Sequence, residues 1–330
     1  MRNLASCLTA LLMVSMMALM NVALGAASEE ELRQFSARVA KQHKLDEQWI
    51  RKTLGQAKLK QAVRNAYKRT AESKPWSEYR PIFVTKKRAR AGHRFWRKHD
   101  ADMRRAEEKY GVPAAIIAAI IGVETFYGTY MGKYRVLDSL YSLAFYKWKR
   151  QKFFTRELEQ FLVLSAEGHV DPLTVKGSYA GAMGLPQFIS SSYRAYSVDF
   201  DADGKRNLLT SESDAIGSVA AYLKRHGWRR GAPVAAPTGV TGAYKVAPYK
   251  RNKKPKVGIG KLHAAGVKAF PKLPAKTPAM VVRLRGPAGR EDWVALKNFY
   301  VITRYNHSSL YAMAVYQLAE MIAELRAEGA

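Results

Sequence analysis

Apolar residues recur at helical spacing over most of this 330-residue chain. Near the N-terminus, Leu32, Phe35 and Val39 are separated by polar residues, as in a helix with one buried face, and Asp46 is placed to cap the next helix. The same period marks two later helices, through Ile216, Val219, Ala220 and Leu223 and through Tyr311, Val315, Leu318 and Ile322. The pattern predicts a mainly α-helical protein.

Two stretches depart from this one-faced pattern. Residues 86–110 carry mixed charges around apolar and aromatic positions, which predicts one long amphipathic helix. Residues 114–123 are apolar on every side and follow Pro113, a residue suited to the start of a helix. Because a helix that is apolar all round is normally buried, we expect this one inside the core.

The composition changes after the helix at 216–223. Residues 215–290 contain no Asp or Glu but 17 Lys and Arg, and eight of the 13 prolines lie between 233 and 287. Short β-type runs occur at 280–284 and 293–296. We interpret about 232–296 as an irregular basic insertion with a few strands; a disordered basic linker is the alternative.

The first 27 residues have the pattern of a secretory signal. Arg2 precedes an apolar stretch at 8–24, which ends in the small residues 25–27. An uncleaved anchor is the alternative, but the run is near the lower length limit for a spanning helix, so we favour cleavage. Cys7 lies before the apolar stretch, where a lipidation signal does not belong, so we expect no lipoprotein anchor.

These patterns divide the chain into five expected parts. They are a signal peptide at 1–27, a helical N-terminal part at 28–110, a core at 111–231, the basic insertion at 232–296, and a return to the core with a C-terminal helix at 297–330.

The formal net charge of +28 restricts the partners. It favours nucleic acid, an anionic membrane surface or a polyanionic polymer, and an exported protein is not expected to meet genomic DNA. A hydrophobic content of 48% excludes a disordered basic tail, and a single cysteine excludes a disulfide framework, a thiolate zinc cluster and an iron–sulfur site.

Glu124 is the most informative candidate for catalysis. It ends the apolar helix and is followed by Thr125, Phe126, Tyr127 and Gly128. A carboxyl in such surroundings is poorly solvated, which raises its pKa and suits a general acid that works near neutral pH. The alternative is a Glu at a helix end that faces solvent or pairs with a basic neighbour.

Two further segments have residues suited to a sugar ligand. Residues 176–188 contain three glycines, which allow close approach, and Ser178 and Gln187 offer hydrogen bonds without charge; a plain turn between helices is the alternative. In residues 303–309, Tyr305 suits stacking and Asn306 suits amide recognition, whereas Ser308 or Ser309 is expected to cap the last helix.

Residues 199–207 begin like an EF-hand calcium loop. Asp199, Asp201 and Asp203 alternate and Gly204 takes the sixth position. Because Thr210 occupies the twelfth position, an ordinary EF-hand is excluded, and Asp214 is a candidate to close a longer loop. An acidic surface turn is the alternative.

Taken in order along the chain, these segments resemble the membrane-bound lytic transglycosylase B family of bacterial cell-wall enzymes. The resemblance covers most of the mature chain and is carried by IIGVETFYG, LDSLYSLAF, KGSYAGAMGLPQF, SSYRAYSVDFDADG, DAIGSVAAYLKRHGW and NFYVITRYNHSSLYAMAVYQLAE. It implies a mainly α protein whose lysozyme-like α+β catalytic core carries a helical N-terminal part and a small β-containing insertion. This chain lacks the proline usual after Gln187-Phe188 and lacks a usable lipoprotein signal, so it looks like a soluble periplasmic relative.

The resemblance implies a role for each candidate residue. Glu124 becomes the sole catalytic acid and base. The substrate-binding positions are Tyr79, Lys149, Arg150, Ser178, Gln187, Tyr305, Asn306 and Tyr311, with Lys149 and Arg150 near the peptide side of the substrate. A structural Ca²⁺ would be held by Asp199, Asp201, Asp203, Lys205 through its carbonyl, and Asp214, although the loop is one residue longer than in the family. No cofactor is expected for catalysis.

The expected reaction is cleavage of the β-1,4 bond between N-acetylmuramic acid and N-acetylglucosamine with formation of a 1,6-anhydromuramyl end. The expected partners are peptidoglycan glycan strands, with cell-wall synthesis or division proteins as further candidates and no nucleic acid, and we expect a monomer. A hydrolytic muramidase and a non-catalytic wall-binding protein are the alternatives.

Overall fold

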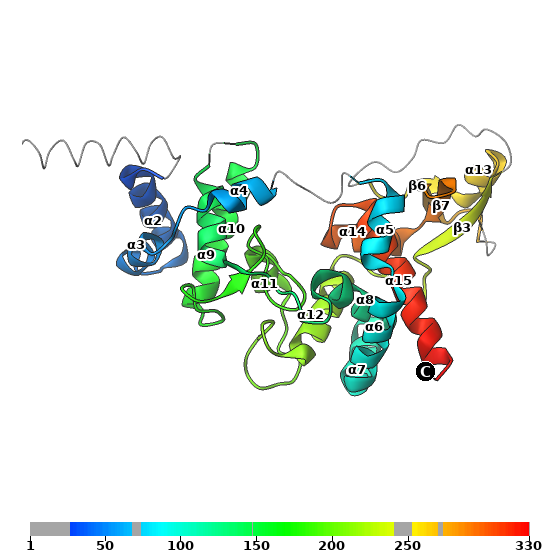
Figure 1. Ribbon diagram of the computed structural model, residues 1–330, viewed down its shortest axis with the longest axis horizontal. Coiled ribbons are helices and arrows are strands. Elements are labelled where there is room, and N and C mark those ends of the chain that lie inside the picture. Colours follow the sequence, from blue (N-terminus) through cyan, green and yellow to red (C-terminus); the bar gives the residue numbers. More distant parts are fainter. Residues whose placement is uncertain (1–26, 68–73, 147, 241–252, 270–272, 330) are drawn as a thin grey trace, which may run out of the picture. The chain divides into compact units, whose positions relative to one another are not determined.

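The contacts of the chain divide it into two compact units. The computed structural model describes residues 27–67, 74–146, 148–240, 253–269 and 273–329 (Figure 1). Unit 1 takes in Met1–Arg69 and Met131–Ala195, and unit 2 takes in Thr70–Tyr130 and Tyr196–Ala330. The expected signal peptide falls outside the described residues except for Ala27. Within the described ranges, no helix combines the length and apolar character needed to span a membrane.

Unit 1 is a cluster of helices with one short two-stranded ladder. Its helices are α2 (Glu29–His43), α3 (Glu47–Gly55), α4 (Gln61–Tyr67), α9 (Val136–Ala144), α10 (Gln151–Ala166) and α11 (Ser190–Tyr196), and β1 (Tyr134–Arg135) pairs antiparallel with β2 (Lys176–Gly177). The expected cap is confirmed, because Asp46 Oδ1 accepts a hydrogen bond from the Gln48 amide at the start of α3. Helices α9 and α10 pack against each other.

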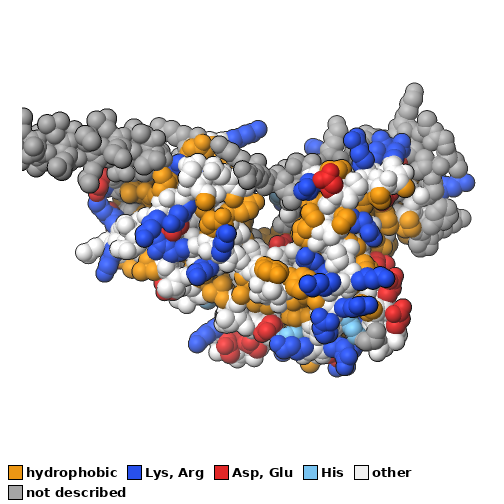
Figure 2. Space-filling model, viewed as in Figure 1, with side chains coloured by type: hydrophobic (Ala, Val, Ile, Leu, Met, Phe, Trp, Pro, Cys, Tyr) orange, Lys and Arg blue, Asp and Glu red, His pale blue; other side chains and the backbone are white. Residues whose placement is uncertain are grey.

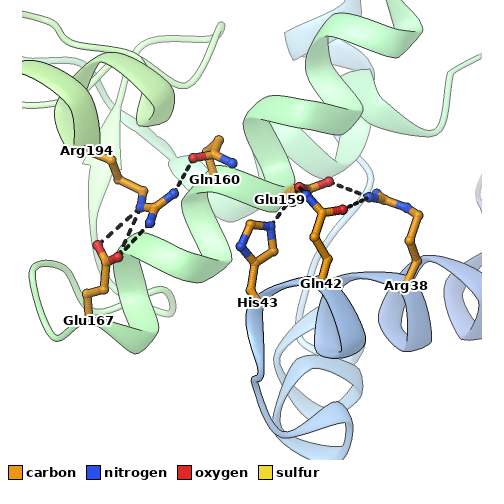
Figure 3. A network of polar contacts seen from close by, with 7 residues as sticks. All are labelled: Arg38, Gln42, His43, Glu159, Gln160, Glu167 and Arg194. Atoms are coloured by element: carbon orange, nitrogen blue, oxygen red, sulfur yellow. Dashed lines mark hydrogen bonds and ion pairs between the residues drawn. The ribbon is translucent and has the colours of Figure 1, made fainter.

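A buried carboxylate connects α2 to α10 (Figure 3). Glu159, whose side chain is only 6% exposed, accepts hydrogen bonds from Arg38 Nη1 at 2.6 Å and Gln42 Nε2 at 3.1 Å, and its Oε1 lies 2.8 Å from His43 Nε2. Burial raises the pKa of Glu159, but the hydrogen bonds from His43 and Arg38 outweigh it, so the net shift is downward. The ionised form is therefore the one that the fold favours.

Unit 2 is built around the helix that was expected to be buried. Helix α8 (Ala114–Thr125) begins after Pro113, and every residue from Ala114 to Val123 is buried. The helices around it are α5 (Trp76–Phe83), α6 (Lys86–Lys98), α7 (Asp100–Tyr110), α12 (Glu212–Arg225), α14 (Lys297–Tyr305) and α15 (Ser309–Ala327). Of these, α6, α7, α12 and α15 pack directly against α8. The sequence-based positions of α8, α12 and α15 are confirmed.

The prediction of one long helix over residues 86–110 is wrong. The structure has two helices, α6 and α7, which meet at His99. The backbone of His99 has φ −114° and ψ 31°, outside the helical range, so α6 ends and α7 begins at this residue. Asp100 begins the next helix and pairs with Arg104 at 2.7 Å and with Arg326 of α15 at 2.8 Å. An acidic residue in the first turn stabilises a helix start, which explains why a new helix begins at this point.

The basic insertion forms an antiparallel sheet. Its strands are β3 (Ala235–Val240), β4 (Val257–Gly258), β5 (Val267–Ala269), β6 (Pro278–Gly286) and β7 (Gly289–Ala295), in the order β4-β6-β7-β3-β5. With the short helix α13 (Ile259–Ala264), the sheet encloses a small core that includes Leu262, Val281 and Val294, all fully buried. The described part of the insertion is therefore a packed subdomain rather than a linker, and both expected strand runs are confirmed.

The positive charge is also concentrated outside this insertion. Lys and Arg side chains gather over α6 and α7 on the face shown in Figure 2. The exposed cations of α6 are Lys86, Lys87, Arg90, Arg94, Arg97 and Lys98, and the helix has no acidic residue. Together with the small sheet, the helices of both units confirm the mainly α fold class.

Candidate active site

Glu124 is the penultimate residue of α8, and the backbone turns sharply just after it. Phe126, Tyr127 and Gly128 have φ values of 50°, 58° and 86°, so three consecutive residues take left-handed conformations. Such conformations are costly for residues with side chains and persist only where the surroundings enforce them. They end the helix abruptly and leave Glu124 in its last turn, partly buried.

The side chain of Glu124 is held by the start of the last helix. Tyr311 Oη donates a hydrogen bond to Glu124 Oε1 at 2.7 Å, and Tyr311 is only 2% exposed. Burial raises the pKa of Tyr311 well above its usual range, and the nearby charge of Glu124 raises it further. Tyr311 therefore stays protonated and acts as a fixed donor to the carboxylate.

Two other tyrosines belong to the same unit. The ring of Tyr305 stacks with that of Tyr311 at 6.4 Å between centroids and an interplanar angle of 9°. Burial, and then the charge of Glu124, raises the pKa of Tyr305 as well. Tyr79 of α5 is 2% exposed and stacks on Trp76 at 6.3 Å. Unit 2 thus places Tyr305 and Tyr311 near Glu124, and Tyr79 lies close enough to Tyr311 to raise the pKa of its hydroxyl.

The turn between α14 and α15 carries Asn306. Its backbone is extended, and its carbonyl accepts a hydrogen bond from the Ser308 amide at 2.8 Å. Ser308 is the N-cap of α15, with its hydroxyl 3.4 Å from the Tyr311 amide, so the capping prediction is confirmed for Ser308. The same cap fixes the first turn of the helix from which Tyr311 reaches Glu124.

Residues not singled out from the sequence support the end of α8. Arg88 Nη1 donates to the carbonyl of Gly122 at 2.6 Å, and a cation is favourable at a helix C-terminus. Tyr127 Oη donates to the carbonyl of Arg88 at 3.1 Å. A β-carbon on Gly122 would lie 2.4 Å from Tyr127 Oη, and one on Gly92 would lie 2.3 Å from it. The two glycines therefore form the space in which the Tyr127 ring packs between α6 and α8.

Ser178 organises a tight turn in unit 1. Its amide donates to the carbonyl of Ala182 at 2.8 Å, and its hydroxyl accepts from the amides of Ala180 and Ala182 at 3.2 and 3.1 Å. These bonds occupy the acceptor positions of the hydroxyl and leave its proton to be donated. A β-carbon on Gly177 would lie 2.1 Å from the carbonyl oxygen of Ala182, so this glycine serves backbone packing within the turn.

Gln187 lies in the same glycine-rich segment with a left-handed φ of 49°. Its Nε2 donates to the carbonyls of Met131 at 3.1 Å and Gly184 at 2.9 Å. With both amide hydrogens used inside unit 1, its carbonyl oxygen is the group suited to a ligand.

Lys149 and Arg150 lie just before α10 and are exposed. The Arg150 guanidinium bonds to the hydroxyl of Tyr67 and lies 4.4 Å from the centroid of the Phe153 ring. The sequence-predicted residues are thus divided between the units. Glu124, Tyr79, Tyr305, Asn306 and Tyr311 belong to unit 2, and Lys149, Arg150, Ser178 and Gln187 belong to unit 1.

The acidic loop forms a cluster of oxygen donors in unit 2. Asp199, Asp201 and Asp203 each place a carboxylate oxygen within 4.8 Å of the others. Asp214, fully buried, accepts from the amides of Phe200 at 2.7 Å and Asn207 at 2.6 Å, and burial raises its pKa. Carboxylate oxygens are hard ligands of the kind that Ca²⁺ prefers, so these residues fit that ion.

Comparison with known proteins shows the family of the chain. The profile of the Transglycosylase SLT domain matches residues 27–320. The chain is 41% identical over 313 residues to membrane-bound lytic murein transglycosylase B of Escherichia coli (strain K12), covering 92% of this chain and 85% of that protein.

Solved structures of lytic transglycosylases are also similar to this chain. Lytic transglycosylase SltB1 from Pseudomonas aeruginosa is 45% identical with a TM-score of 0.85, over 91% of this chain and 99% of that one. Escherichia coli Slt35, solved in complex with calcium, is 42% identical with a TM-score of 0.82, over 90% and 93% of the two chains. Pseudomonas aeruginosa SltB3, solved with NAG-anhNAM-pentapeptide, is 29% identical with a TM-score of 0.75, over 88% and 79%.

The fold and the matches define a lysozyme-like enzyme that cleaves peptidoglycan, a lytic transglycosylase. The chain belongs to the transglycosylase SLT domain family that includes membrane-bound lytic murein transglycosylase B. The expected family, enzyme class and lysozyme-like fold are confirmed.

Proposed function

We propose that this lytic transglycosylase uses Glu124 as its sole acid and base and leaves a 1,6-anhydromuramyl end. The observation that carries the proposal is the 2.7 Å hydrogen bond from Tyr311 Oη to Glu124 Oε1. It holds the carboxyl group of Glu124 in a fixed position at the end of α8. Glycosidases generally use two carboxylates, and one suffices where the substrate itself supplies the nucleophile.

The first step breaks the glycosidic bond. Protonated Glu124 gives its proton to the bridging oxygen, the bond from that oxygen to muramyl C1 breaks, and N-acetylglucosamine leaves with a free hydroxyl. The carbonyl oxygen of the muramyl acetamido group stabilises the positive charge at C1. Proton transfer from a positioned carboxyl contributes roughly 10²–10⁴-fold to the rate.

The second step closes the anhydro ring. The carboxylate of Glu124 takes the proton from the muramyl C6 hydroxyl while that oxygen bonds to C1. Glu124 is thereby returned to its acid form, and no water is consumed. Orientation of the C6 hydroxyl and exclusion of water must supply the rest of the rate enhancement.

The remaining residues are proposed to bind the strand. Ser178, whose proton is free to be donated, and Asn306 orient the acetamido group, and Gln187 accepts from a sugar hydroxyl. Tyr79, Tyr305 and Tyr311 line the aromatic part of the site. Lys149 and Arg150 supply positive charge for the carboxylates of the stem peptide.

We also propose a structural Ca²⁺ in the acidic loop. Asp199, Asp201, Asp203 and the carbonyl of Lys205 would hold the ion, and Asp214, which already binds two loop amides, closes the set. The calcium complex of Slt35 supports this assignment. The ion would act on stability rather than on the reaction.

The cell wall substrate and the sequence of residues 1–27 together support export to the periplasm by a cleavable signal peptide. The structure of SltB3 in complex with NAG-anhNAM-pentapeptide supports glycan strands as the partner.

Digestion of purified sacculi tests the reaction. The soluble muropeptides should be lighter by one water than the reducing-end products of a muramidase, and Glu124→Gln should release none while still binding sacculi. Products with reducing ends would assign a hydrolase, and activity retained by Glu124→Gln would remove Glu124 from the mechanism.

A further inference from the structure

Unit 2 has a cavity that none of the proposed catalytic residues lines. Its volume is about 400 Å³, within the range of pockets that bind small molecules and short peptides. Its walls come from the chain after α12, from the segments that lead into β4 and β6, and from the first residue of α14.

Three cations line this cavity. Arg229, Lys254 and Lys297 all contribute, and no described lining residue is acidic. Within the described residues, none of the three forms an ion pair, and the sequence has no Asp or Glu from 215 to 290. Burial lowers the pKa of Lys297, and the charges of Lys254 and Arg229 lower it further. An anion would relieve this repulsion.

The other walls are apolar and rigid. Pro233, Pro255, Pro274 and Pro278 line the cavity together with Leu273 and Leu296. Proline fixes its own backbone φ, so these walls lose little freedom when a ligand binds. The ligand that matches such a cavity combines an anionic group with small apolar groups.

The arginine side of the cavity is fixed by a buried amide. Asn298 is fully buried, accepts from the Arg229 amide at 2.9 Å, and donates to the carbonyls of Arg229 and Ala232, each at 2.8 Å. The turn after α12 is therefore tied to the start of α14, so the cavity exists before any ligand arrives.

We propose that this cavity binds the carboxylate end of a peptidoglycan stem peptide, as an anchoring site distinct from the site of glycan cleavage. Stem peptides carry free carboxylates beside alanine methyl groups, which is the combination that the cavity matches. The inference rests on peptidoglycan as the substrate, but not on the role of Glu124.

Helix α14 begins at the cavity, and its length sets the distance from the cavity to the proposed sugar-binding residues Tyr305 and Asn306. Helix α14 starts with Lys297 and ends with Tyr305, next to Asn306. At about 1.5 Å per residue its nine residues span about 14 Å. An extended tetrapeptide spans at most about 13–14 Å. A stem peptide whose sugar lies at Tyr305 and Asn306 therefore has the length to reach the three cations.

Binding of a synthetic stem tetrapeptide without sugar tests the proposal, measured by calorimetry on the full mature chain. We expect Lys254→Gln with Lys297→Gln to weaken binding about tenfold, and a C-terminally amidated peptide to bind the unaltered protein about tenfold more weakly. The matched control is Lys268→Gln, which should leave the affinity for the tetrapeptide unchanged. Lys268 is an exposed cation on β5, at the far edge of the sheet. The double variant that includes Lys297→Gln is replaced if it fails to fold. Its replacement combines Arg229→Gln with Lys254→Gln, because both of these positions are exposed.

Several outcomes would overturn the assignment. Tetrapeptide binding that is unchanged in the cavity variants, or lost only in Lys149→Gln with Arg150→Gln, places the peptide elsewhere. Displacement of the peptide by equimolar inorganic phosphate indicates a general anion site. Retention on phosphatidylglycerol vesicles without peptide binding indicates a lipid surface. Because the probe contains no glycan, each result is independent of whether Glu124→Gln is inactive.

Discussion

The hydroxyl of Tyr311 lies 2.7 Å from Oε1 of Glu124, although 186 residues separate the two in sequence. Tyr311 is in the first turn of α15 and Glu124 in the last turn of α8, so the bond joins the start of one buried helix to the end of another. The packing of α15 against α8 holds the distance, and the raised pKa of Tyr311 keeps its proton in place.

Replacing Tyr311 by Phe removes this donor and keeps the ring. We expect kcat for sacculus digestion to fall about 10- to 100-fold with a smaller change in KM, since fixed donors at reacting groups contribute on this scale. Tyr316→Phe, in the same helix, is the matched control and should keep its activity. Equal losses in the two variants would show that the effect comes from helix α15 in general.

Gly122→Ala should disturb the end of α8. Its new methyl group would lie 2.4 Å from Tyr127 Oη, and overpacking of this kind costs about 1–3 kcal/mol. Thermal unfolding and turnover should both report the loss, because the shift reaches the residues just after Glu124. Gly55→Ala is the control, since nothing lies within 4 Å of its added carbon. A Gly122→Ala protein as stable and active as the parent would contradict the packing described.

Glu159→Gln should destabilise the protein by about 1–3 kcal/mol at neutral pH, the scale of hydrogen bonds to a buried charged group. The pKa of Glu159 is lower in the folded state than its usual 4.5, so its contribution is present above that value. It disappears as the pH falls through the folded-state pKa.

The difference in unfolding free energy between parent and Glu159→Gln should therefore shrink at acid pH, measured by urea unfolding at several pH values. Glu30→Gln removes an exposed ion pair with Arg33 and is expected to have little effect on the free energy of unfolding. If the difference in unfolding free energy grew as the pH fell, folding would raise the pKa of Glu159 instead of lowering it.

Removal of calcium should lower the unfolding temperature without changing the reaction products. Asp199, Asp201 and Asp203 repel one another when no cation lies between them, so chelation should destabilise the loop. Differential scanning calorimetry with and without EGTA measures the shift, and Asp201→Asn should reduce it. Identical unfolding temperatures with and without chelator in the parent protein would argue against a bound ion.

Several features could be predicted from the sequence because they depend on neighbours along the chain. Apolar periodicity located α12 and α15, a continuous apolar run after Pro113 located α8, and short polar residues before the helices made Asp46 and Ser308 recognisable as caps. Glu124 was recognisable because an apolar helix ends there. The break at His99 was missed, since the charge pattern of residues 86–110 is compatible with one helix and Asp100, just after the break, pairs with Arg326, far along the chain.

The contacts that hold Glu124 could not be predicted in the same way. The bond from Tyr311, the guanidinium of Arg88 on the Gly122 carbonyl and the fit of Tyr127 against Gly92 all join residues distant in sequence. The resemblance to a family suggested Tyr311 as a lining residue but not as a donor to the carboxylate. Tertiary packing decides these relationships, and periodicity carries no information about it.

Both ends of helix α8 are fixed. The helix begins directly after Pro113, and it ends at Thr125 because the residues that follow have left-handed conformations. Each residue of an α-helix rotates the next side chain by about 100°. A single insertion or deletion between these ends would turn the carboxyl of Glu124 away from Tyr311 without altering any residue of the site. The length of α8 is therefore itself a catalytic parameter, and homologous chains that keep every site residue but change this length should be inactive.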